Sequence, residues 1–161
     1  MKLICIGDSL TFGYGVHLSQ RWTRLCAQET GWELVNEGIN GDTTGGMLAR
    51  MQGGVLAELR EGGLGADRPY VLLMGGSNDV FYSGSDAAAR GNMGAMIHQL
   101  FSVGVLPVVG IPLPADAPHA PRAWAAAVDF EAAERSQKSL RSSALLSPTS
   151  VMNVKFRLPM S

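Results

Sequence analysis

The sequence has few cysteines, little charge and no long apolar segment. Its two cysteines, Cys5 and Cys26, have no neighbour at metal-ligand spacing, so we interpret both as buried thiols. Charged residues make up 17% of the chain and the net charge is −1, which argues against nucleic acid or an anionic membrane as a partner. The apolar run at the amino terminus is too short for a signal peptide or a membrane span. We therefore expect a cytoplasmic protein that acts on a neutral or small molecule.

The last part of the chain lacks both histidine and acidic residues. No histidine follows His119, and no aspartate or glutamate follows Glu134. Residues 1–134 carry 8 basic and 14 acidic residues, a net charge of −6, whereas residues 135–161 carry five basic residues and seven serines. We therefore expect one domain over residues 1–134, followed by an atypical basic, serine-rich segment that is either a last strand or a tail.

Short apolar runs alternate with helical patterns along the chain. We expect strands at residues 3–6, 33–36, 70–74, 106–111 and 151–156, and helices at residues 21–30, 46–60, 85–103 and 121–138. Gly53 and Gly54 weaken the second of these helices. The alternation predicts an α/β fold, a mostly parallel sheet with helices on both faces. Its functional loops should gather at the carboxyl edge of the sheet.

Three polar loops follow the first three predicted strands, and each holds a residue suited to acyl transfer. Ser9 can act as a nucleophile if a base takes its proton. Gly41 can offer an unobstructed backbone N–H, and the side-chain amide of Asn78 can donate to a developing oxyanion. Each also has a structural interpretation: Ser9 as a helix cap, Gly41 as a left-handed turn residue and Asn78 as an Asx-turn.

The motifs in these loops resemble those of the SGNH or GDSL hydrolases, in particular the small esterases and lysophospholipase or thioesterase-like members. They are GDSL at residues 7–10, NGDT at residues 40–43 and GSND at residues 76–79. The likeness extends through GIPLP at residues 110–114. It implies a flavodoxin-like three-layer α/β/α fold and the hydrolysis of small esters or thioesters through an acyl-serine. It also implies that the enzyme needs no metal or organic cofactor.

Carried over by position, the resemblance makes Ser9 the nucleophile and one donor of the oxyanion hole. Gly41 and Asn78 are the other two oxyanion donors, and Asp8 shapes the loop. The chain departs from the family near its carboxyl end, where members carry an Asp-x-x-His pair that supplies the catalytic base. Asp116 and His119 have that spacing but follow an earlier strand.

The other two histidines are weaker candidates for the base. We interpret His17 as a solvated loop residue and His98 as a structural residue of a helix. Because the composition changes near Arg135, we expect an atypical carboxyl end; whether it is native, truncated, substituted or frame-altered stays open on the sequence alone. An esterase without its histidine should be strongly impaired.

Two other functions stay open on the sequence alone. The chain can be a catalytically inactive binding module that keeps the site but lacks the base. A nucleotide or phosphate binder is weakly supported by GGS at residues 75–77, since neither phosphate-binding glycine fingerprint is present. The aromatic residues near the loops can line an apolar substrate pocket or simply pack at its rim; they are Phe12, Tyr14, Phe81 and Tyr82. The sequence does not predict the oligomeric state.

Overall fold

The computed structural model describes residues 1–61 and 69–110, and within them one parallel sheet is present. Its strands are β1 (Lys2–Gly7), β2 (Glu33–Gly38), β3 (Tyr70–Met74) and β4 (Val108–Val109). They lie in the order β2-β1-β3-β4, and all three pairings are parallel. This order is that of flavodoxin-like sheets, as predicted. Gly7 at the end of β1 is aligned with Gly38 of β2 and Met74 of β3.

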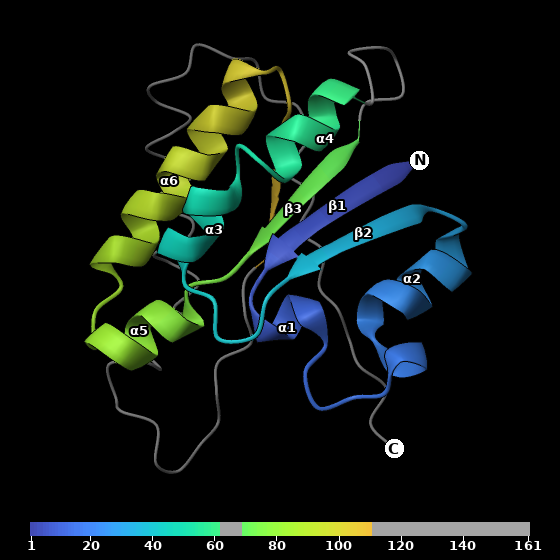
Figure 1. Cartoon of the computed structure of the whole chain (residues 1–161), viewed down its shortest axis with the longest axis horizontal. Coiled ribbons are helices and arrows are strands. Elements are labelled where there is room, and N and C mark those ends of the chain that lie inside the picture. The colour runs from blue at the N-terminus through green and yellow to red at the C-terminus, as the bar shows by residue number, and fades with distance from the viewer. Residues whose placement is uncertain (62–68, 111–161) are drawn as a thin grey trace.

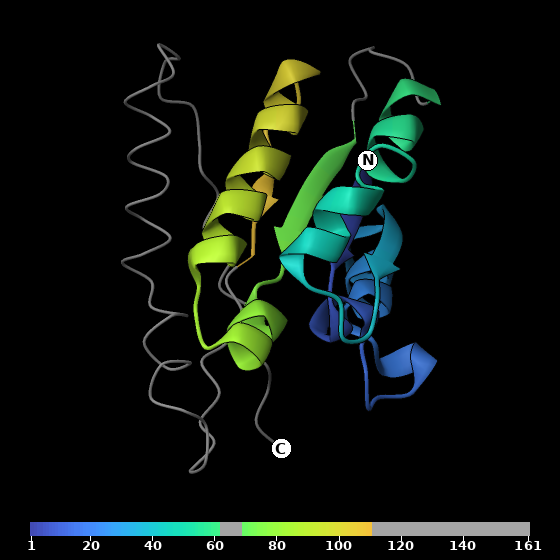
Figure 2. The same ribbon diagram turned by 60° about the vertical axis from the view of Figure 1, so that its left-hand side comes forward.

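Helices cover both faces of the sheet, which gives three layers (Figure 1). The helical segments are α1 (Ser9–Phe12), the 3₁₀ turn η1 (Leu18–Gln20), α2 (Trp22–Thr30), α3 (Thr44–Arg50), α4 (Val55–Glu61), α5 (Ser77–Ser83) and α6 (Ala87–Ser102). Helices α3, α4 and α6 lie on one face, with α3 beside α6, while α2 packs against β2 (Figures 1 and 2). The arrowheads of β1, β2 and β3 point to the edge where α1 and α5 lie (Figure 1).

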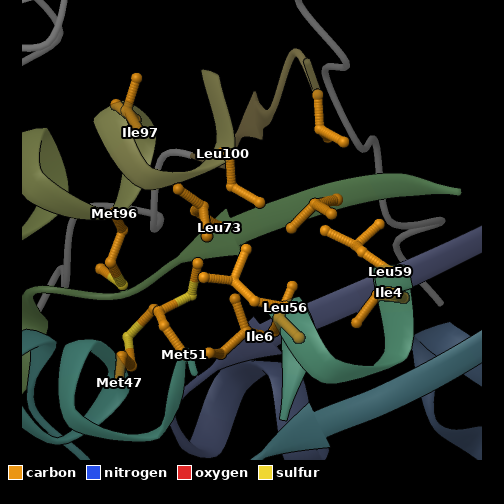
Figure 3. Packing of buried hydrophobic residues seen from close by; sticks show 13 residues of the cluster. Ile4, Ile6, Met47, Met51, Leu56, Leu59, Leu73, Met96, Ile97 and Leu100 are labelled. Atoms are coloured by element: carbon orange, nitrogen blue, oxygen red, sulfur yellow. The ribbon is translucent and has the colours of Figure 1, made fainter. Parts of the chain in front are cut away.

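The main core lies between the sheet and the face formed by α3, α4 and α6 (Figure 3). Alternate strand residues point into it, because successive side chains of a strand face opposite sides. The buried members are Ile4, Ile6, Met47, Met51, Val55, Leu56, Leu59, Val71, Leu73, Met96, Ile97, Leu100 and Val105. Cys5 lies between two of these strand positions and is fully buried, so burial raises the pKa of its thiol to about 12. Cys26 is half-buried.

The predicted helix at residues 46–60 is wrong as a single element. It is divided into α3 and α4 by a turn at residues 51–54 that contains Gly53 and Gly54. Glycine favours such a break because it loses more backbone entropy in a helix than other residues do. The short helices α1 and α5 were not predicted, and both lie inside polar loops at the carboxyl edge.

The remaining predictions agree closely with the structure or fall outside it. The strands predicted at residues 3–6, 33–36 and 70–74 and the helices predicted at residues 21–30 and 85–103 are confirmed within two residues. Of the strand predicted at residues 106–111, the described part (106–110) pairs with β3 at Val108–Val109, and residue 111 lies outside the described residues. Elements predicted at residues 121–138 and 151–156 lie outside the described residues. No helix within residues 1–61 and 69–110 is long and apolar enough to span a bilayer.

Candidate active site

Ser9 is the first residue of α1, two residues after the end of β1. The cap of this helix is Asp8, whose Oδ1 accepts a hydrogen bond from the Leu10 amide at 2.9 Å. This contact agrees with the loop-shaping role that the resemblance gives Asp8. Ser9 itself is not the capping residue, and its side chain makes no hydrogen bond to another described residue. The hydroxyl is therefore not committed to holding the helix end.

Glycines at the ends of β1 and β2 allow α1 to lie directly against the sheet. A Cβ on Gly7 would overlap the side chain of Thr11 and the Met74 carbonyl oxygen. A Cβ on Gly38 would overlap the backbone of Phe12. Because no side chain separates these strand ends from the helix, the strands fix the height of Ser9 above the sheet edge.

Gly41 lies in the loop between β2 and α3 and adopts a left-handed conformation with φ of +74°. Gly41 thus holds a left-handed turn position, where other residues are strained, and its role as an oxyanion donor stays a prediction. A hydrogen bond from the Asp42 amide to the Ile39 carbonyl closes the turn at 3.2 Å. The hydroxyl of Tyr82 lies next to Gly41, 3.7 Å from the position that a Cβ would occupy.

Asn78 and Asp79, in the first turn of α5, attach this helix to the loop that contains Gly41. The side-chain amide of Asn78 donates to the backbone carbonyl of Asp42 at 2.7 Å. The carboxylate of Asp79 accepts from the backbone amide and the hydroxyl of Thr44, at 2.9 and 2.6 Å. Asn78 therefore contacts a different loop of the chain, one residue from Gly41, which a local Asx-turn would not explain.

A third connection joins the loop at Ser9 to the loop at Gly41, and sequence reasoning missed it. Arg50 of α3 donates through Nη2 to the Gly7 carbonyl and through Nε to the Asp42 carboxylate, both at 2.9 Å. The acids that follow β2 and β3 also affect Asp8, the acid that follows β1. Burial raises the pKa of Asp8, and the charges of Asp42 and Asp79 raise it further.

The described histidines lie on the surface. His17 is exposed, caps η1 and hydrogen-bonds to the Ser19 hydroxyl at 2.9 Å, in agreement with a solvated loop residue. His98 lies in α6, the helix predicted for it, but it is exposed there instead of partly buried. Asp116 and His119 lie outside the described residues.

The aromatic residues near the loops divide into two groups. Phe12 packs under the guanidinium of Arg21, 4.1 Å from its ring centroid, which is a rim contact. Tyr14, Phe81 and Tyr82 are 73%, 69% and 65% exposed. Phe81 and Tyr82 contact each other edge to face. No group of three or more metal-ligating side chains is assembled in the described part of the chain.

Comparison with known proteins identifies the family. Residues 5–145 match the model of the GDSL-like lipase/acylhydrolase family. Esterase TesA of Pseudomonas aeruginosa is 29% identical over 119 residues, which cover 70% of this chain and 55% of TesA. The chain thus spans about half the length of this curated relative.

Solved structures of the family share the fold. A crystal structure of TesA matches with a TM-score of 0.65 and 26% identity, over 85% of this chain and 75% of that chain. A G-D-S-L family protein of Desulfitobacterium hafniense matches with a TM-score of 0.70 and 24% identity, over 86% and 73% of the two chains. The sheet order, the three ordered motifs and the match over residues 5–145 lead to one conclusion: the chain belongs to the GDSL-like lipase/acylhydrolase family.

Proposed function

We propose that the chain is a serine ester hydrolase that acts on a small ester or thioester, with Ser9 as its nucleophile. The Ser9 hydroxyl attacks the substrate carbonyl, and the alcohol or thiol leaves to give an acyl-serine that water hydrolyses. The backbone amides of Ser9 and Gly41 and the side-chain amide of Asn78 donate to the oxyanion. Preorganised donors of this kind contribute about 3 to 4 kcal/mol each.

The observation that carries the proposal is the contact between Asn78 and the loop of Gly41. The amide of Asn78 has two N–H donors, and the bond to the Asp42 carbonyl uses one of them. That bond orients the amide plane, so the second N–H keeps a fixed direction for an acceptor. A preorganised donor is effective because it does not have to reorient as charge develops in the transition state.

The proposed activity is impaired, because the chain has no Asp-x-x-His pair after residue 134. A triad hydrolase without its base keeps about a thousandfold rate enhancement from oxyanion stabilisation and binding. Asp116 and His119 have the spacing of the missing pair and are its candidate replacements. His119 serves as the base only if its ring reaches the Ser9 hydroxyl directly or through one water.

Hydrolysis of a short-chain p-nitrophenyl ester tests the role of Ser9. The parent should turn over the ester above the buffer rate, and Ser9→Ala should abolish this excess. Ser102→Ala is the matched control, because Ser102 is an exposed serine at the far end of α6. Equal rates for the parent and Ser9→Ala would refute the proposed activity.

Added imidazole tests whether only the base is missing. It should raise the rate of the parent more than that of Ser9→Ala, whose rate in the same buffer measures hydrolysis by imidazole alone. If His119 is the substitute base, His119→Ala should lower the rate measured without imidazole. If it is not, that rate should stay the same. An imidazole effect of the same size in the parent and Ser9→Ala would contradict an activatable serine.

The absence of the pair also favours a second candidate, an inactive binding module with the same fold. A fluorophosphonate distinguishes the two, since it labels only an activated serine. Stoichiometric labelling at Ser9, absent in Ser9→Ala, would exclude the binding module. A complete lack of labelling, together with no Ser9-dependent turnover, would support it.

A further inference from the structure

The guanidinium of Arg50 lies between the loop that carries Ser9 and the loop that carries Gly41. Its Nη2 donates to the Gly7 carbonyl, two residues before Ser9, and its Nε donates to the Asp42 carboxylate, one residue after Gly41. A third nitrogen, Nη1, lies 3.7 Å from the Glu37 carboxylate of β2. The side chain is only 21% exposed, so water competes weakly for these contacts.

Asp42 extends this connection to the third loop. Its carboxylate accepts from Arg50, while its backbone carbonyl accepts from the Asn78 amide. A continuous path of hydrogen bonds therefore runs from Gly7 through Arg50 and Asp42 to Asn78. Each of the three proposed oxyanion donors lies on this path or within two residues of it.

We propose that Arg50 is a positioning residue that sets the distances among the oxyanion donors. The proposal rests on the proposed function, because it concerns the same donors. The planar guanidinium donates in two fixed directions at once, whereas a lysine ammonium on its flexible chain is a single point charge. Arg50 thus holds the end of β1 at a fixed distance from the loop after β2. Asp42 of that loop in turn fixes the position of the Asn78 amide, which donates to its backbone carbonyl.

Arg50→Lys is the sharpest variant, because it keeps the charge and removes the fork. We expect kcat for Ser9-dependent ester hydrolysis to fall by about a hundredfold, as a displacement of about 1 Å at a catalytic group can cost. The KM should change little, because donors that act only on the oxyanion do not bind the ground state. Arg90→Lys is the control, since Arg90 of α6 is exposed and pairs with Asp86, the residue before this helix.

Coupling between variants separates positioning from a general loss of stability. Asp42→Asn weakens the pairing with Arg50 but keeps the backbone carbonyl that Asn78 uses. Asp42→Asn should lower kcat as Arg50→Lys does. The variant that carries both substitutions should have a kcat no lower than that of either single variant. Asn78→Ala should cost at least several-fold less in the Arg50→Lys background than in the parent, because its amide is already misplaced. The proposed path would be contradicted if the effects on kcat were independent, both for Arg50→Lys with Asp42→Asn and for Arg50→Lys with Asn78→Ala.

Amide NMR spectra keep the test independent of whether the chain is active. Arg50→Lys should shift the backbone amide signals of Ser9 and Gly41 and the side-chain amide signals of Asn78, and Arg90→Lys should not. If Ser9→Ala equals the parent in rate, the proposed function fails, yet these signals still decide the role of Arg50. Where Arg50→Lys does not fold, Asp42→Asn replaces it in the kinetics, in the coupling with Asn78→Ala and in the NMR spectra. A folded variant whose signals and kcat match those of the parent would overturn the inference.

Discussion

Asp8 combines a capping role with burial that opposes its charge. It is only 1% exposed, and its carboxylate accepts from the Leu10 amide. Burial raises its pKa above the ordinary value of 3.8, more than that hydrogen bond lowers it. The folded protein therefore binds the proton more tightly than the unfolded chain does. Its favourable contribution to stability is complete below the unfolded pKa and is lost as the pH rises through the raised folded pKa.

Substitution of Asp8 by asparagine should remove this pH dependence. Asparagine is an equally good helix cap and carries no charge to bury. Relative to the parent, Asp8→Asn should therefore gain free energy of unfolding as the pH rises from about 4 to about 7. Urea unfolding of both proteins across this range measures the difference. A difference that stays constant with pH would show that the charge of Asp8 is not penalised in the fold.

Single residues also show which parts of the site the sequence predicts. Ser9, Gly41 and Asn78 stand out because each follows a predicted strand and has a suitable side chain or backbone. The role of Arg50 depends on contacts with Gly7, 43 residues away, and with Asp42. Asp79 likewise holds Thr44 from 35 residues away. Local sequence patterns carry no information on such partners, so these residues became evident only in the structure.

Among the elements, α1 depends on two strand glycines. Gly38→Ala should displace α1, because the new methyl group meets the Phe12 backbone and not a movable side chain. Overpacking of this kind costs about 1–3 kcal/mol of stability, and Ser9-dependent hydrolysis should fall with it. Thermal or urea unfolding gives the first quantity, and the p-nitrophenyl ester assay gives the second.

Gly91→Ala is the matched control for that substitution. Gly91 lies within α6, and nothing but its chain neighbours and the helix's own backbone lies within 4 Å of the position that its Cβ would take. Alanine is favoured over glycine inside a helix, so this variant should gain about 0.5–1 kcal/mol and keep the parent's activity. A loss of stability from Gly91→Ala, or none from Gly38→Ala, would contradict this account of the two sites.

The helix boundaries show where local signals sufficed and where they did not. The helix predicted at residues 21–30 ends as α2 does, just before Gly31, which adopts a left-handed conformation. Signals for α1 were also present, with Asp8 as its cap and Gly13 at its end, but its four residues are too few for a helical periodicity. Short helices of this kind are stabilised by the contacts that their ends make with the rest of the fold.

For the molecule as a whole, stability depends on the core between the sheet and the α3, α4 and α6 face. Leu100 of α6 is fully buried in this core. Leu100→Ala should lower the free energy of unfolding by about 2–5 kcal/mol, because it leaves a cavity. Leu25→Ala on α2 is the control, since Leu25 is 47% exposed and should cost less than about 1 kcal/mol. Equal urea midpoints for the two variants would contradict this assignment of the core.

The order β2-β1-β3 has a consequence for the time at which the site forms during synthesis. The contacts of Asn78 and Asp79 with the loop after β2 span 36 and 35 residues, and that of Arg50 with Gly7 spans 43. A ribosome adds about 5–20 residues per second, so the first residue of each pair is synthesised several seconds before its partner. During that interval β1 is exposed at the side where β3 will pair. The loops of the candidate site therefore cannot all be joined before residue 79 has been synthesised.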